Sequence, residues 1–534
     1  MNKVIPKLIL WAIIITWFVF GIYRIDRNGL TFDDSYNAQV AAHFAQTLEY
    51  AVEYPDVIPC SVKITTGPTM LLPTALLYRL FGVSALTTQI VALLYSVLLI
   101  IAVFKFADFI VKRWTWASLA VLICFMLASN WLYSLSIVLL GEIAALFFVV
   151  ASLYHLCKFI EERYVRCLFL SGMFLAFSLV TKTSQVFMCI VIPILLLFNV
   201  IVFRNIKFKN LIRWSVGFVF GYGIFEAFKF WQLGSVEAYI NNWNEQRENV
   251  YSQTGTSNFF DRFDAAQIKE RWDYLQYVFG LNSVARMVLM LVPIIVIIVL
   301  LIKRFTSIAV KRGIVYMIAA YGVAADSMLV YYVLFGSAGL TYARRMAVYS
   351  ETLFICNLML LATFTYYAFS PVSWEGEKKL MAKIIAPILC IICVILCVPT
   401  IKNSLANYTK LPEYSATHDA NERLVDFVET LPDDANLYTY DWWQAPEISL
   451  MTDLTFKDIS SQYDDITKID FEKSYVIAGY QVLGSYAYDG SFDDYINQLF
   501  ITERIYSDDG ISMDGGYVVY KLVGVNEEVE DKVF

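Results

Sequence analysis

The sequence predicts an α-helical polytopic membrane protein with about eleven transmembrane helices and a C-terminal extracytoplasmic α/β domain. Three observations lead to this fold class. The chain of 534 residues is 58% hydrophobic and only 17% charged, whereas an average globular chain has about 25% charged residues. Apolar runs of about twenty residues, each long enough to cross a bilayer, recur through the first part. After residue 400 they give way to short alternating segments. We therefore expect a membrane domain at 1–400 and a soluble domain at 401–534.

Each predicted crossing is an apolar run with few charges. The runs lie at 8–23, 86–108, 116–135, 142–157, 167–182, 184–203, 211–229, 284–302, 314–335, 348–369 and 384–400. Lys and Arg near helix ends are retained on the cytoplasmic side, and here they fall in alternate loops. Examples are Lys7, Lys112, Lys158, Lys207, Lys303 and Lys379. An odd number of crossings then places the N-terminus in the cytoplasm and the C-terminal domain outside the plasma membrane.

Charge and residue counts argue against several classes of function. A net charge of −7 without a basic patch argues against a nucleic-acid partner. Of the nine cysteines, only Cys60 falls in a predicted external segment, so no disulfide framework is available. This usage fits a bacterial surface protein. With three histidines in the whole chain, a His-based metal site is not expected.

The predicted external loop 24–85 is the most informative segment, because a rigid bundle can position loop residues against a lipid-borne substrate. Asp33 and Asp34 precede apolar residues at every fourth position from Tyr36 to Leu48. This spacing predicts an amphipathic helix in the interface plane, with the acids at its N-terminal end. The alternative for the acids is that one caps the helix and the other is a solvated neighbour.

The order of features in this loop resembles that of a known family. The acid pair and the aromatic helix are followed by a Pro-containing apolar segment, Ile64–Pro73, and by Leu80-Phe81-Gly82. This order resembles the first external loop of C-type (GT-C) glycosyltransferases, in particular the protein O-mannosyltransferase and aminoarabinose-transferase group. The resemblance extends over about residues 8 to 200. Its further motifs are Gly141-Glu142, Leu153-Tyr154, Gly172 and Thr181-Lys182.

The resemblance implies roles for individual residues. Asp33 corresponds to the catalytic acid, and Asp34 to a second acid that is usually Glu. Where the family has a Lys or His followed by two prolines, this chain has Thr66-Gly67-Pro68, so Lys63 is the candidate to replace the missing cation near the lipid phosphate. Glu142 and Lys182 are implied to face the same cavity as Asp33. Both also fit ordinary helix termini in the interface.

Two further pairs are candidates for substrate binding. Arg344 and Arg345 lie beside the tenth run, on the side where positive residues are scarce. Arg suits a leaving phosphate because its planar fork binds two oxygens, although two interfacial anchors would have the same sequence. Trp442 and Trp443 follow a predicted strand and fit either sugar stacking or packing of the tail onto the membrane part, with packing the more frequent use. The elements expected in the tail are strands at 436–440, 474–478 and 516–521 and a helix at 421–430.

The leading hypothesis is a glycosyltransferase that moves a hexosyl or pentosyl group from a polyprenyl-phosphate donor to a cell-envelope glycan, lipid or protein at the outer face. Asp33 is the general base of this hypothesis. The alternative is a transporter or flippase, which should have paired halves with Gly or Pro interruptions; no such symmetry is visible. A noncatalytic scaffold that displays the tail is a third hypothesis. Carboxylates could hold Mg²⁺ or Mn²⁺, but the resemblance includes metal-free enzymes, so metal dependence stays open.

Overall fold

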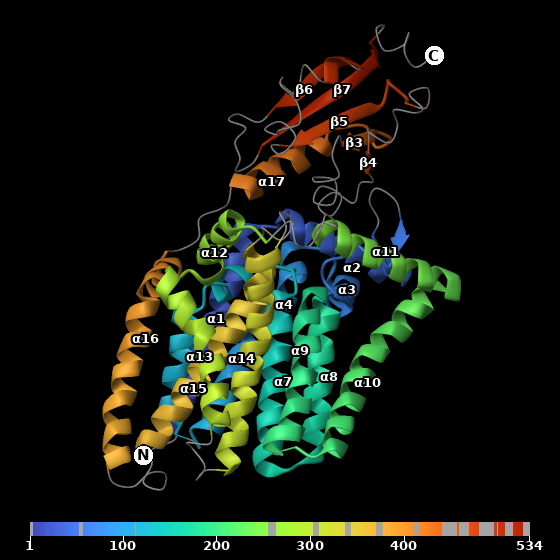
Figure 1. Ribbon diagram of the computed structural model, residues 1–534. Coiled ribbons are helices and arrows are strands. Elements are labelled where there is room, and N and C mark those ends of the chain that lie inside the picture. The colour runs from blue at the N-terminus through green and yellow to red at the C-terminus, as the bar shows by residue number, and fades with distance from the viewer. Residues whose placement is uncertain are drawn as a thin grey trace. The chain divides into compact units, whose positions relative to one another are not determined.

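The computed structural model describes most of the chain (Figure 1). The described ranges are 4–52, 57–112, 114–204, 206–254, 263–302, 309–336, 343–369, 377–410, 416–439, 456–458, 469–479, 496–498, 500–507 and 516–526. The chain divides into two compact units. The bundle unit comprises Met1–Gly21, Thr65–Met70 and Ala92–Leu411, and the loop-and-tail unit comprises Ile22–Ile64, Leu71–Val91 and Pro412–Phe534.

Every predicted crossing coincides with a helix. In chain order they are α1 (Val4–Asn28), α4 (Ala85–Ile110), α5 (Thr115–Ala128), α7 (Glu142–Glu162), α8 (Val165–Thr181), α9 (Val186–Phe198) with η2 (Asn199–Phe203), α10 (Phe208–Leu233), α13 (Ser283–Leu301), α14 (Ala309–Phe335), α15 (Ala347–Phe369) and α16 (Glu377–Thr409). Within the described ranges, nine helices are long and apolar enough to cross a membrane, and α5 and α8 are shorter apolar helices. The chain is a multi-pass membrane protein, as the sequence predicts.

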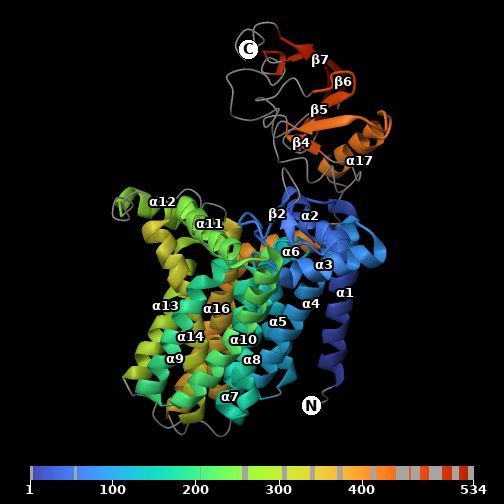
Figure 2. The same ribbon diagram turned by 90° about the vertical axis from the view of Figure 1, so that its right-hand side faces the viewer.

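The bundle is held together by close helix packing. Helix α8 packs against both α7 and α10, and α14 packs against α7, α9, α13 and α15 (Figures 1 and 2). Two glycines permit the approach of α8 to α10. A Cβ atom added at Gly172 would lie 2.1 Å from the Trp214 carbonyl oxygen, and one at Gly217 would lie 2.1 Å from that of Phe169. Small residues at helix contacts allow this approach in membrane proteins, where burial of apolar surface drives association little.

Shorter elements connect the crossings. They are α6 (Leu132–Leu135), η1 (Thr183–Gln185), α11 (Val236–Thr254), α12 (Ala265–Phe279) and η5 (Ala343–Met346). Helix α3 (Pro68–Phe81) has 14 residues, as does α5. Both are shorter than the roughly twenty residues of a full crossing, so the number of about eleven crossings stays a prediction. Helix α16 continues beyond residue 400 to Thr409, and the boundary between 1–400 and 401–534 stays a prediction.

The loop-and-tail unit contains two small sheets. In its loop part, α2 (Phe32–Thr47) is followed by β1 (Ala51–Val52) and β2 (Ile58–Pro59), which pair antiparallel. The tail has α17 (Ala416–Val428), β3 (Asn436–Thr439), β4 (Phe456–Asp458), β5 (Ser474–Gly479), β6 (Phe500–Ser507) and β7 (Tyr517–Val525). The strand order is β4-β3-β5-β7-β6. β3 is parallel to β4 and β5, and β7 is antiparallel to β5 and β6. The predicted α/β character of the tail is confirmed.

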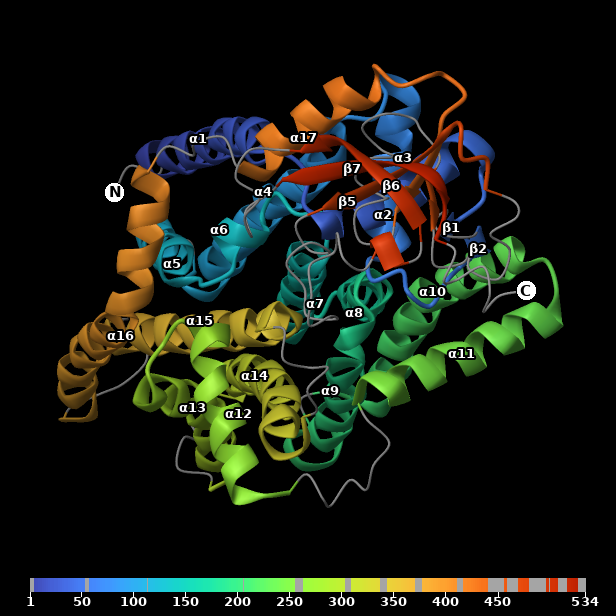
Figure 3. The same cartoon turned by 90° about the horizontal axis from the view of Figure 1, so that it is seen from above.

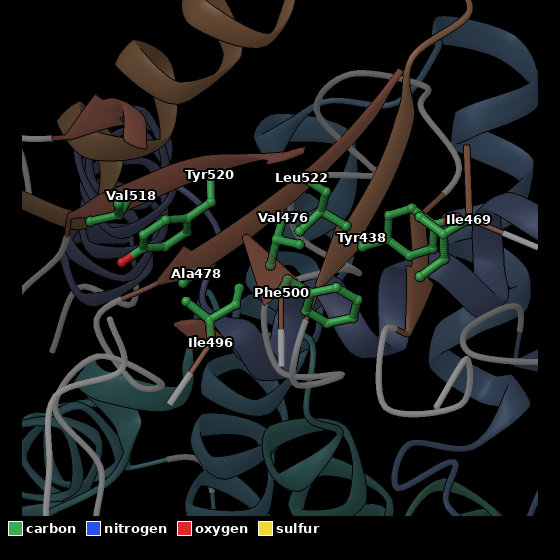
Figure 4. Packing of buried hydrophobic residues seen from close by; sticks show 9 residues of the cluster. All are labelled: Tyr438, Ile469, Val476, Ala478, Ile496, Phe500, Val518, Tyr520 and Leu522. Carbon is green, nitrogen blue, oxygen red and sulfur yellow. The ribbon is translucent and has the colours of Figure 1, made fainter. Parts of the chain in front are cut away.

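Both faces of the tail sheet are buried. Side chains alternate along a strand, so Ile477 faces one side while Val476 and Ala478 face the other. Helix α17 covers the first side, where Leu424 packs in the same cluster as Ile477. The second side is filled by a separate cluster that includes Phe500 (Figure 4). The sheet is thus the centre of a packed domain.

Candidate active site

The acid pair occupies the first turn of α2. Thr31 is the N-cap residue, and its side chain accepts a hydrogen bond from the Asp34 backbone N–H at 3.3 Å. In return, the Thr31 backbone N–H donates to Asp34 Oδ2 at 3.1 Å. The two residues form a capping box, which satisfies backbone donors that a helix start otherwise leaves unpaired. The order Thr-Phe-Asp-Asp therefore determines where α2 begins.

Asp34 is buried and accepts several hydrogen bonds. Its side chain is fully buried, and Oδ2 also accepts hydrogen bonds from Thr31 Oγ1 at 2.9 Å and from Gln89 Nε2 at 2.9 Å. Gln89, in the first turns of α4, donates from the same nitrogen to the Gly29 carbonyl oxygen at 3.0 Å. Burial raises the pKa of the nearby Tyr78 phenol well above its usual value, and the negative charge of Asp34 raises it further. Asp34 thus ties the start of α2 to α4.

Asp33 has a different environment. Asp33 is half-buried, whereas Asp34 is fully buried. The Asp33 carbonyl oxygen accepts a hydrogen bond from Asn37 Nδ2 at 2.9 Å, which fixes the backbone of this turn. The backbone N–H groups of a first helical turn favour a negative charge beside them. Of the two acids, Asp33 is the less buried.

The amphipathic character expected for α2 is wrong. All residues from Asp34 to Ala42 are buried, including the polar Ser35, Asn37 and Gln39. An interfacial helix would expose one polar face. The spacing of large apolar residues from Tyr36 onward correctly predicts a helix, but small and hydrogen-bonding residues on the remaining faces allow this helix to be covered all round. Asp33 and Asp34 are therefore held by a buried helix.

The segment in place of the family's Lys-or-His and proline motif is locked to α8. The Gly67 N–H donates to the Thr181 carbonyl oxygen at 2.9 Å, and the Thr69 and Thr181 hydroxyls lie 2.6 Å apart. Thr66 Oγ1 donates to the Leu139 carbonyl oxygen at 3.3 Å. A Cβ atom at Gly67 would lie 1.7 Å from the Val180 carbonyl oxygen. Gly is therefore required here for close backbone approach. Lys63, the candidate for the missing cation, lies in an exposed turn after β2.

Glu142 and Lys182 form an ion pair. Lys182 Nζ lies 2.9 Å from Glu142 Oε1 and donates to the Leu140 carbonyl oxygen at 2.8 Å. Both side chains are buried. Lys182 ends α8, and Glu142 begins α7 after Gly141, whose φ of 85° favours glycine. Glu142 Oε2 has no hydrogen-bond partner among the described residues. The two charges therefore compensate each other, and Glu142 Oε2 remains able to accept a hydrogen bond.

The remaining candidates are two arginines, which the structure describes, and two tryptophans, which it does not. Arg344 and Arg345 are half-buried residues of η5, immediately before α15. The backbone N–H of Ala343 donates to the Tyr274 hydroxyl at 3.0 Å, which attaches η5 to α12. Trp442 and Trp443 lie outside the described residues.

A buried acid that sequence reasoning did not select lies at the start of α15. Glu351 Oε1 accepts hydrogen bonds from the backbone N–H groups of Asn130 at 3.0 Å and Trp131 at 3.1 Å. Its exposed fraction is 4%. No local motif points to this contact, since the partners are 220 residues apart. The capping box at Thr31, by contrast, has a recognisable sequence pattern.

No three His, Cys, Asp or Glu side chains come together as a metal site within the described ranges. Asp34 Oδ2 is already engaged by three donors. The described residues thus supply no cluster of protein ligands for a divalent ion.

Comparison with solved structures shows the fold. The chain is similar to ArnT from Cupriavidus metallidurans bound to undecaprenyl phosphate, with a TM-score of 0.56 and 11% identity over 96% of this chain and 97% of that one. The chain has the GT-C fold. An oligosaccharyltransferase from Archaeoglobus fulgidus in the apo form gives a TM-score of 0.51 and 10% identity over 96% of this chain and 76% of that one. Its complex with Zn and sulfate also gives 0.51, with 12% identity over 92% and 71%.

No protein-family model matches the sequence, and no curated protein sequence matches it significantly. The sequence resemblance to C-type glycosyltransferases is nevertheless confirmed at the level of the fold.

Proposed function

We propose that this protein transfers a single hexosyl or pentosyl group from a polyprenyl-phosphate donor to a hydroxyl acceptor of the cell envelope, at the outer face of the membrane. The proposal rests on the different environments of the two acids, Asp33 and Asp34. Asp34 Oδ2 is engaged by three hydrogen-bond donors, whereas Asp33 keeps a half-buried position in the first turn of the same helix. A scaffold shared with membrane glycosyltransferases supports the same reading.

Asp33 is the proposed general base. Its carboxylate takes the proton of the acceptor hydroxyl as the acceptor oxygen forms a bond to the anomeric carbon of the sugar. The bond between that carbon and the phosphate oxygen breaks, and polyprenyl phosphate leaves with the electron pair. Asp34 positions Asp33, because its network fixes the start of α2.

The phosphate needs cations as it departs, since charge develops on its oxygens. Arg344 and Arg345 are the proposed ligands, because a planar guanidinium can bind two phosphate oxygens. Lys63 is the second proposed source of positive charge, and its exposed turn leaves the ammonium accessible. The proposal also assigns Glu142 and Lys182 to substrate binding. The unused Glu142 Oε2 can accept a hydrogen bond from a sugar hydroxyl. Trp442 and Trp443 remain candidates for stacking against a sugar.

Paired amide substitutions test the assignment. Asp33→Asn retains the size of the side chain but removes the proton acceptor, so turnover should fall by about 10² to 10⁴. Asp34→Asn should retain most of the turnover of the folded fraction. Transfer is measured with purified protein, a lipid extract that contains polyprenyl-linked sugars and an envelope extract as acceptor. Near-normal transfer by Asp33→Asn would refute the role of base. Movement of the lipid across the bilayer without any transfer would favour the flippase alternative.

A further inference from the structure

Helix α10 crosses the membrane and turns sharply into α11. Gly234 ends α10 with a φ of 69°, and its N–H donates to the Phe230 carbonyl oxygen. Helix α11 then runs at a steep angle to α10 (Figure 1) and lies at the periphery of the bundle helices (Figure 3). Because α10 is a crossing, the first turns of α11 are at the level where the hydrocarbon ends.

Two contacts fix the orientation of α11 on α10. The Tyr239 hydroxyl donates to Glu226 Oε2 at 2.6 Å. Lys229 Nζ lies 4.7 Å from the centre of the Trp243 ring and 5.5 Å from that of Tyr239. Lys229 is buried, and a cation over an aromatic ring is attracted most strongly where water is excluded. The face that α11 turns away from α10 is therefore defined.

An apolar stripe on α11 is exposed. Val236 is 61% exposed, Ile240 is 52% exposed and Trp243 is 41% exposed. These positions are four and three residues apart, so they share one face of the helix. Arg247 continues the stripe one turn later and is also exposed.

A second face of α11 is acidic and exposed. Its members are Glu237, Asn241, Glu245 and Glu248. A helix with one exposed apolar stripe and one charged face is typical of segments that lie in a membrane interface.

The outer end of α10, directly before α11 in the chain, also exposes apolar side chains. Near the outer end of α10, Ile224 is 51% exposed, Phe230 44% and Trp231 62%. These side chains belong to a helix that is long and apolar enough to cross a membrane. We propose that α11 lies on the bilayer surface, with Val236 and Ile240 inserted between lipid headgroups and Arg247 on their phosphates, while Trp243 lies at the edge of the stripe, against Lys229 of α10. The half-exposed Trp243 ring suits this depth, because Trp is enriched at membrane interfaces. The proposal is independent of the transferase assignment.

Spin labels on two faces of α11 test the proposal. Ile240→Cys and Glu245→Cys are each labelled with a nitroxide in the full-length protein, reconstituted in phosphatidylcholine–phosphatidylglycerol nanodiscs. The signal of labelled unsubstituted protein, which retains its native cysteines, is subtracted. Collisions with oxygen report lipid, and collisions with a water-soluble nickel chelate report solvent. We expect the oxygen-to-nickel ratio at position 240 to exceed that at position 245 by roughly threefold or more, because the interface buries the apolar face about 5–10 Å.

Three other outcomes would overturn the proposal. Equal, nickel-dominated ratios at both positions would show that α11 stands in water. Protection of position 240 from both reagents would show that protein covers the stripe. A high oxygen ratio at position 245 rather than 240 would show that the helix is rotated. As a matched variant, Tyr239→Phe removes the hydrogen bond to Glu226 and should lower the ratio at position 240 without lowering transfer activity.

Discussion

Asp34→Ala should destabilise the loop around α2 far more than Asp33→Ala. The substitution removes the acceptor of hydrogen bonds from the Thr31 N–H, Thr31 Oγ1 and Gln89 Nε2. Gln89 Nε2 still donates a hydrogen bond to the Gly29 carbonyl oxygen. The two donors of Thr31 are therefore the groups that lose a hydrogen-bond acceptor. A hydrogen bond to a charged group contributes about 1.5–3 kcal/mol, and the three share one oxygen, so their losses overlap. With the loss of the cap included, we expect about 3–4 kcal/mol.

The assay is thermal denaturation of the detergent-purified protein, combined with hydrogen exchange of the α2 amides. For a chain of 534 residues, the expected loss corresponds to a fall in Tm of roughly 3 °C, provided that the loop unfolds with the rest of the protein. Asp34→Asn retains one oxygen acceptor and should lose about half as much. Asp33→Ala should lose about 1 kcal/mol or less, mainly the favourable charge at the helix start. An unchanged Tm and unchanged exchange in Asp34→Ala would refute the structural role of Asp34.

Three further substitutions or fusions test other parts of the account. Gly67→Ala should lower Tm and expose the 65–70 segment to protease, because the new Cβ would collide with the Val180 carbonyl oxygen; Gly223→Ala, where no atom lies within 4 Å, is the control and should be neutral. Arg344→Ala or Arg345→Ala should weaken donor binding by roughly 10- to 100-fold in a lipid-binding assay, and unchanged affinity in both would make them interfacial anchors. A reporter fused after Thr409 should be active only outside and one at position 207 only inside; a cytoplasmic reporter after Thr409 would contradict the proposed orientation.

The crossings could be predicted from the sequence because their signal is local. Each needs only a run of apolar residues of sufficient length, and all the predicted runs coincide with helices. The acid pair at a helix start was also predictable, since Thr31, Asp33 and Asp34 lie within one turn. The character of α2 was not, because burial depends on what surrounds a helix. Asn37 and Gln39 are polar, yet both are buried.

Contacts between distant residues could not be predicted. Gln89 meets Asp34 across 55 positions, and Trp131 meets Glu351 across 220. The resemblance implies only that Glu142 and Lys182 face the same cavity as Asp33; it does not indicate their direct ion pair, which depends on where α7 begins and α8 ends. The requirement for Gly67 likewise depends on the backbone of residues 180 and 181, which no spacing in the sequence indicates.

The central claim is transfer of a sugar from a polyprenyl phosphate with Asp33 as base. Its most direct measurement is mass spectrometry of the lipids before and after incubation of the purified protein with polyprenyl-linked sugar donors and an acceptor extract. We expect polyprenyl phosphate to appear together with an equal amount of glycosylated acceptor. Both signals should fall by about 10² to 10⁴ in Asp33→Asn, while Asp34→Asn retains them. Donor lipids left unchanged by the wild-type protein, or consumed equally by Asp33→Asn, would contradict this claim.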